Sequence, residues 1–135
     1  MKVNVIIEKG KDGTYDACME VHKDLTFGLL GQGKTVKEAI EDFYITFEDM
    51  KNLYQDTGQK FPENLEFVFR YDVASFLAYY SNVLSLAGLE RITGVNQHQL
   101  SHYATGHRKP GPKTIAKIES SLHRFGQEIS QVSFV

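Results

Sequence analysis

The segment Asn96–Lys109, NQHQLSHYATGHRK, constrains the fold of this chain more than any other. It is mostly polar, but Leu100 and Tyr103 lie three residues apart, so both can point from one side of a helix into an interior. Asn96 can cap the start of this helix, and Gly106 permits the left-handed conformation with which many helices end. The pattern therefore predicts a short helix that is held by one narrow apolar face and leaves its other side chains in solvent.

Helical patterns flank this segment on both sides. Upstream, Leu86–Thr93 has apolar residues spaced for one helix face, and Gly94-Val95 follows as a turn. Downstream, the basic cluster His107-Arg108-Lys109 leads through Pro110-Gly111-Pro112 into a further helix from about Lys113. Two helices joined by a short glycine turn, with polar side chains on the second, are typical of a helix-turn-helix, whose second helix enters the major groove of DNA.

The charges around this segment favour the same interpretation. Between Arg91 and Lys117 there are five Arg or Lys and no Asp or Glu, which is the electrostatic pattern of a surface that binds phosphates. Asn and Gln, which are frequent in the predicted helix, are the side chains that can pair with adenine through two hydrogen bonds. A polar helix alone is more often only a solvated surface. The prediction therefore rests on the combination of turn, polar helix, basic cluster and closing helix.

The distribution of charge divides the chain into two parts. Residues 1–71 carry nine Lys or Arg and thirteen Asp or Glu, a net charge of −4, whereas residues 72–135 carry six and four, a net charge of +2. We expect two domains with these boundaries and with different partners. Cys18 is the only cysteine, which fits a reducing cytoplasm, and no apolar run approaches the ~18 residues of a membrane span.

The first domain is predicted to be a small α+β unit of order β-β-β-α-β. Its strands are expected at Lys2–Glu8, Thr14–Val21, about Thr26–Leu30 and, after the helix, Leu65–Tyr71. The glycines of Gly31-Gln32-Gly33 are expected to end the third strand. Thr35-Val36-Lys37-Glu38 is a capping box, which predicts the start of a helix of about five turns.

The second domain is predicted to be helical except at its end. A helix over Val73–Asn82 precedes the helix-turn-helix pattern. The last residues, Ile129–Val135, alternate in polarity, which predicts a short strand. A lone strand must pair with another strand, so we expect this one to join the N-terminal sheet or the same strand of a second subunit across a two-fold axis.

Three segments of the sequence resemble a known family. The segments KVNVIIEKGKDGTYDACMEV and GQGKTVKEAIEDF are similar to the HicB antitoxin domain, a partial ribonuclease-H-like module of order β-β-β-α-β. The segment LERITGVNQHQLSHYATGHRKPGPKTIAKIESSLHRFGQEI is similar to the Cro/repressor class of helix-turn-helix, which is appended to many HicB proteins. Together these resemblances cover most of the chain.

The resemblance implies an antitoxin that represses its own operon. In this family the N-terminal domain binds HicA, a small ribonuclease toxin that cleaves messenger RNA, and blocks its active site. The C-terminal domain binds operator DNA as a homodimer or higher homo-oligomer. The residues that match repressor positions facing bases are Gln97, His98, Gln99 and His102. The residues that match positions near phosphates are Ser85, Asn96, Ser101, His107, Arg108 and Lys109.

Three features depart from the family pattern. Repressors prefer a small residue where this chain has Glu90, five residues before the turn valine, because the two helices approach closely there. Thr93 stands where a larger aliphatic residue is common. The segment His22–Gly31 lacks the proline-rich loop that is common in HicB domains, so the face presented to a toxin is expected to differ.

Other functions are weaker interpretations of the same residues. A solitary DNA-binding regulator with an N-terminal dimerisation or ligand-sensing domain stays open. An enzyme is not expected, because Glu8, Asp16 and Glu20 are spaced as a solvated sheet surface and not as the converging carboxylates of a metal-dependent nuclease. His98 and His102 lie one helical turn apart, a spacing that also suits zinc, but no cysteine or acidic residue stands beside them. We therefore expect groove contact, with no metal, no cofactor and no membrane.

Overall fold

The computed structural model describes all residues from Met1 to Val135. The chain divides into two compact units, Met1–Asp72 and Val73–Val135, so the division falls one residue from the boundary expected from charge and pattern. All four strands lie in the first unit and four of the five helices lie in the second, which makes the chain an α+β protein. None of its helices is long and apolar enough to cross a lipid bilayer.

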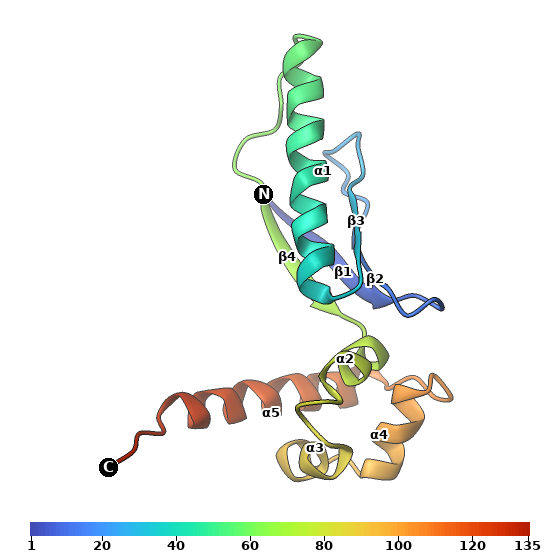
Figure 1. Ribbon diagram of the computed structural model, residues 1–135, viewed down its shortest axis with the longest axis vertical. Helices are drawn as coiled ribbons and strands as arrows, with labels where there is room; N and C mark the ends of the chain where they lie inside the picture. The colour runs from blue at the N-terminus through green and yellow to red at the C-terminus, as the bar shows by residue number, and fades with distance from the viewer. The chain divides into compact units, whose positions relative to one another are not determined.

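A four-stranded mixed sheet forms one layer of the first unit (Figure 1). Its strands are β1 (Lys2–Lys9), β2 (Tyr15–Met19), β3 (Leu30–Gly33) and β4 (Glu66–Tyr71). Their order is β3-β2-β1-β4, and β4 runs parallel to β1 while the other neighbours are antiparallel. The parallel pair requires a crossover connection, which the helix between β3 and β4 supplies.

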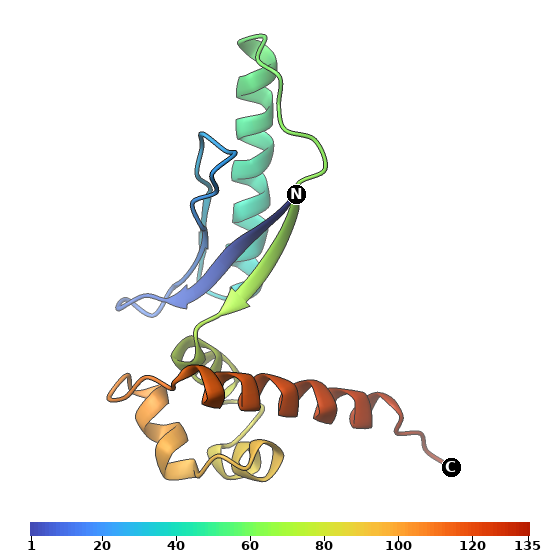
Figure 2. The ribbon, with the colours of Figure 1, turned by 180° about the vertical axis from the view of Figure 1, so that it is seen from behind.

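Helix α1 (Val36–Asp56) is this crossover, and it lies along one face of the sheet in both views of the ribbon (Figures 1 and 2). The helix begins as predicted, because the Thr35 hydroxyl accepts a hydrogen bond from the Glu38 amide at 3.1 Å. The Glu38 carboxylate reaches back one residue further than a capping box requires and accepts from the Lys34 amide at 2.8 Å. Two free amides at the helix start are thereby satisfied.

The core of the first unit lies between α1 and the sheet. The alternation predicted for the first strand is confirmed, since Val3, Val5 and Ile7 are buried. Phe43 of α1 is fully buried, and its ring meets Phe67 of β4 edge-on with the ring centroids 4.9 Å apart. Such edge-to-face contacts add to the apolar burial that holds the helix on the sheet.

The third strand was predicted wrongly, because its residues are Leu30–Gly33 and not Thr26–Leu30. The glycines that were expected to end it are strand residues, and Gly31 and Gly33 pair with Ala17 and Tyr15 of β2. A side chain is excluded at both positions because α1 approaches closely. A methyl carbon on Gly31 would lie 2.7 Å from the Phe43 Cα atom and closer still to the Ala39 carbonyl oxygen.

The buried face predicted for the second strand also needs a correction at its end. Tyr15, Ala17 and Met19 are buried as expected, but Val21 is fully exposed. The strand ends at Met19, so Val21 has left the sheet and its side chain has no neighbour to pack on.

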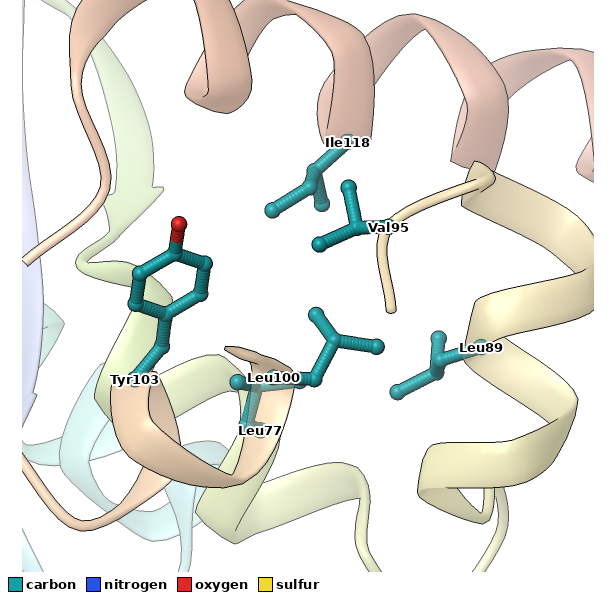
Figure 3. Close-up of a cluster of buried hydrophobic side chains, with 6 residues drawn as sticks. All are labelled: Leu77, Leu89, Val95, Leu100, Tyr103 and Ile118. Carbon is teal, nitrogen blue, oxygen red and sulfur yellow. The ribbon is translucent and has the colours of Figure 1, made fainter. Parts of the chain in front are cut away.

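Four helices form the second unit around one core. They are α2 (Val73–Tyr80), α3 (Leu86–Thr93), α4 (Gln97–Ala104) and α5 (Pro112–Ser130). Figure 3 shows how α3, α4 and α5 each direct side chains into the same interior. The buried cluster consists of Leu77, Leu89, Val95, Leu100, Tyr103 and Ile118. Both apolar residues predicted to hold the polar helix, Leu100 and Tyr103, are therefore core residues.

The C-terminal strand predicted over Ile129–Val135 is absent. Helix α5 continues to Ser130, and the five residues after it form no strand. Ile118, Leu122, Phe125 and Ile129 recur at spacings of three and four residues, so the apolar stripe of one helix continues to its last turn. Ile129, with which the predicted alternation began, is the last residue of this helical stripe.

The close approach of α1 to β3 gives a test of the fold. We expect Gly31→Ala to lower the free energy of unfolding of the first unit by about 1–3 kcal/mol or more, because the added methyl group meets backbone atoms that cannot move aside. Gly28→Ala is the matched control, since a methyl group there has open space around it. The measurement is urea unfolding of both variants, and equal stabilities would contradict the packing described.

Candidate nucleic-acid interface

A tight turn joins α3 to α4. Gly94 ends α3 in the left-handed conformation, with a φ of 72°, and its amide donates to the Glu90 carbonyl oxygen at 2.8 Å. A residue with a side chain is disfavoured at such a φ, which explains the glycine of the turn. Val95 follows and is buried, so the turn is anchored to the core before α4 begins.

Thr93, which departs from the repressor pattern, has a specific role in this turn. Its side chain is buried, and its hydroxyl donates to the Leu89 carbonyl oxygen at 2.7 Å. The same hydroxyl accepts from the Val95 amide at 3.1 Å. A larger aliphatic side chain would leave this buried amide without a partner, so the threonine satisfies the backbone where the chain changes direction.

Glu90 also departs from the repressor pattern, and its side chain joins the two helices instead of separating them. Its carboxylate accepts a hydrogen bond from the Gln97 amide at 2.5 Å. This amide is at the first position of α4, where no partner within the helix exists and where a negative charge is favourable. The longer side chain therefore substitutes a charge-assisted hydrogen bond for the close contact that a small residue would allow.

The start of α4 carries the polar residues predicted from the sequence. Asn96 caps the helix, because its side-chain oxygen accepts from the His98 amide at 2.7 Å. Gln97, His98 and Gln99 are exposed, whereas Leu100 on the opposite side is almost fully buried. Their side chains are therefore free to meet a partner without any loss of core packing.

The remaining predicted residues lie on three different elements. Ser101 and His102 continue α4 and are half-buried. His107, Arg108 and Lys109 are exposed in the loop that follows, which is tied back to α4 by the Arg108 amide donating to the His102 carbonyl oxygen at 3.2 Å. Ser85 begins α3, where its hydroxyl accepts from the Gly88 amide at 3.0 Å. The structure thus joins α4 to the basic loop and places Ser85 on a separate helix end.

His102 occupies an unusual position within this group. Its Nε2 atom lies 3.2 Å from Nε2 of His98, and its ring also contacts that of His107. Its Nδ1 atom is buried and has no hydrogen-bond partner. Partial burial, followed by the nearby charges of His98, His107 and Arg108, lowers the pKa of His102 below its ordinary value.

One basic groove was not predicted from the sequence. A cavity of about 550 Å³ lies between the end of α3 and α5, and Arg91, Lys117 and Arg124 line it together with the single carboxylate Glu128. Lys117 and Arg124 are seven residues apart, so they share one side of α5. This spacing was visible in the sequence, but the packing of α3 against α5 that adds Arg91 was not.

Of the carboxylates considered for catalysis, Glu8 and Asp16 lie directly opposite each other on β1 and β2, and Glu20 follows the end of β2. Asp16 accepts from the Gln32 side chain at 3.1 Å, and Glu20 accepts from the Asn4 side chain at 3.0 Å. Nowhere in the chain do three or more His, Cys, Asp or Glu side chains form a group that could hold a metal ion. The polar residues of α4 and its loop are therefore the most developed candidate site.

Comparisons with known proteins add no identification: no family model matches this chain, and neither a curated protein nor a solved structure matches it.

The hydroxyl of Thr93 provides a test of how α4 is positioned. We expect Thr93→Val to destabilise α3 and α4 by about 1–3 kcal/mol, because it leaves the buried Val95 amide unpaired. Thr93→Ser keeps the hydroxyl and loses only a buried methyl group, at a cost of about 0.8 kcal/mol. Amide hydrogen exchange of both variants measures the difference locally, and a smaller effect for the valine than for the serine would contradict this role.

Proposed function

We propose that the second unit binds duplex DNA as a helix-turn-helix, with α4 as the helix that enters the major groove. The observation that supports this most directly is the division of α4 between a buried apolar side and an exposed polar end. Gln97, His98 and Gln99 lie at the N-terminal end of the helix, which is the part of a recognition helix that meets base edges. Leu100, on the opposite side of the helix, is buried and fixes the helix to the core.

The charge of the second unit supports the same proposal. Val73–Val135 contains six Lys or Arg and three Asp or Glu, a net charge of +3. One of the three carboxylates, Glu90, is occupied by the amide of Gln97 and does not oppose an incoming phosphate as a free charge. Arg108 and Lys109 lie beyond the end of α4 and are exposed, as residues that contact the DNA backbone must be.

We further propose that the protein is the antitoxin of a toxin–antitoxin pair and represses its own operon. The β-β-β-α-β order of the first unit is the order that the resemblance to the HicB domain implies. The exposed side of α1 is acidic, with Glu41, Glu48 and Asp49 in solvent, and only Glu41 has a basic partner, Lys37 at 4.0 Å. An acidic surface complements a basic ribonuclease such as a HicA-like toxin and steers their association.

A single unit of this kind meets one half of a symmetric operator, so we propose that a homodimer or higher homo-oligomer binds DNA. The end of α5 and the residues after it replace the absent strand as the candidate contact, because Ile129, Val132 and Phe134 are exposed there. Two recognition helices then protect two half-sites about one helical turn apart, which a footprint on the selected duplex would measure.

The two roles of the interface residues give a test of the DNA proposal. On a duplex selected from a random pool, we expect Gln97→Ala to weaken binding by about 1–3 kcal/mol and to relax the sequence preference. Arg108→Ala should weaken binding to all duplexes and reduce the slope of log K against log salt by about one. Gln127→Ala, at an exposed position of α5, is the control. An equal effect of Gln97→Ala on all sequences, measured by fluorescence anisotropy, would mean that α4 does not face the bases.

A growth assay tests the antitoxin proposal. The small open reading frame adjacent to this gene should arrest growth when expressed alone, and co-expression of the full chain should restore growth. The double variant Glu48→Lys and Asp49→Lys should rescue less well, because it reverses the charge of the surface proposed to meet the toxin. Glu119→Lys, exposed on α5, should rescue fully. A neighbour without toxicity would favour a solitary DNA-binding regulator whose first unit dimerises or senses a ligand.

A further inference from the structure

Three of the five histidines of the chain meet at α4 and the loop after it. His98 and His102 are one helical turn apart, and their ring centroids are separated by 4.7 Å. The ring of His107, from the loop, also contacts His102 at the same centroid distance. The three imidazoles therefore form a continuous row on the surface proposed to bind DNA.

The contact between the first two rings limits how many protons the row can hold. The Nε2 atoms of His98 and His102 are 3.2 Å apart, so in a hydrogen bond between them one nitrogen carries the hydrogen and the other accepts it. Two imidazolium rings have hydrogens on all four nitrogens and cannot make this bond. Two positive charges at this separation also repel each other.

The middle ring is the one least able to take up a proton. An imidazolium needs an acceptor at each nitrogen, and the Nδ1 atom of His102 is buried without one. Partial burial lowers the pKa of His102, as do the nearby charges of His98, His107 and Arg108. His98 and His107 are exposed, so their rings are open to solvent and to a ligand.

The elements packed against α4 offer few negative charges that could offset the charge of a protonated histidine. Helix α2 carries no Asp, Glu, Lys, Arg or His, and its only titratable groups are the phenols of Tyr79 and Tyr80. On α3, Glu90 accepts from the Gln97 amide at the start of α4, and Arg91 points toward the groove at α5. In the free protein, the charged groups identified around His102 are therefore positive ones.

We propose that His98, His102 and His107 form a proton-binding site that couples DNA binding to pH, with His98 and His107 taking up protons as a phosphate approaches. The proposal rests on the DNA-binding function proposed above and adds its regulation. A phosphate favours the charged form of a nearby imidazole and offsets the repulsion between rings. Because the coupling is reciprocal, a lower pH must strengthen DNA binding by the same free energy.

The size of the effect follows from the number of protons taken up. Uptake of one proton per bound chain changes the affinity roughly tenfold per pH unit over the range in which the histidines titrate. Lys and Arg contacts are fully charged throughout that range and contribute no such slope. The histidines therefore determine the pH dependence, while Arg108 and Lys109 contribute to the affinity equally at both pH values.

The test is the affinity for a mixed-sequence duplex at about pH 8 and about pH 6, at constant salt and with a chelator present to exclude metal ions. We expect the full chain to bind at least roughly tenfold more tightly at the lower pH. The double variant His98→Gln and His107→Gln should lose most of this increase. His123→Gln is the matched control, because His123 is exposed on α5 and outside the row, and it should keep the increase.

A second measurement follows the protons directly. Proton NMR titration of the histidine rings should give higher pKa values for His98 and His107 in the duplex complex than in the free chain, whereas identical values would overturn the proposal. Equal pH dependence of the full chain and the folded double variant would also overturn it while leaving DNA binding intact. Absence of binding to any duplex would overturn the proposed function. The same titration with heparin, a polyanion without bases, would then decide the proton coupling, because the pKa values of His98 and His107 should rise on binding if the coupling exists and stay the same if it does not.

Discussion

The burial of Leu100 is the interaction on which the arrangement of the second unit depends. An eight-residue helix is not stable in water by itself, so α4 exists because its inner side contributes to a shared core. Leu100 and Tyr103 supply that contribution, and Val95 anchors the turn that leads into the helix. The hydroxyl of Thr93 and the carboxylate of Glu90 then satisfy backbone amides that the short helix and tight turn leave open. The polar end of α4 is held in place by residues that lie outside the proposed binding surface.

The difference between local and long-range interactions explains which parts of the chain were predictable from the sequence. Caps depend on residues within three or four positions, so Thr35 and Asn96 were identified from local sequence as the starts of α1 and α4. The third strand depends on pairing with β2 and on the approach of α1, and local sequence contains neither. Gly31 was therefore taken for a terminator, although it is a strand residue on which a helix rests. The C-terminal strand was wrong because Ile129, where the predicted alternation begins, belongs to the apolar stripe of α5, and seven residues are too few to distinguish the two patterns.

The candidate site shows the same limit. The exposed polar residues of α4 were predictable because the spacing of Leu100 and Tyr103 determines which side of the helix is buried. The contact between His98 and His102 also follows from helical spacing. The contact of His107 with His102 depends on how the loop folds back, and the groove lined by Arg91 and Arg124 depends on how α3 packs on α5. The role of Glu90 was not predictable for a related reason, because the sequence showed only a departure from the repressor pattern, whereas its hydrogen bond depends on how α3 meets α4.

The choice of histidine at three neighbouring positions has a physical consequence that lysine or arginine would not have. The histidine rings are separated by 4.7 Å between centroids. Permanent positive charges at these three positions would repel one another in the free protein and weaken the short helix that carries two of them. In the proposed proton-binding site, imidazoles avoid this cost because their charge changes with the binding of a phosphate. They also remain able to donate to a phosphate or to a base edge once protonated. If the chain binds DNA as proposed, a row of histidines next to Arg108 and Lys109 therefore combines constant attraction with a charge that develops on contact. The buried Nδ1 atom of His102 keeps the middle ring from being protonated first.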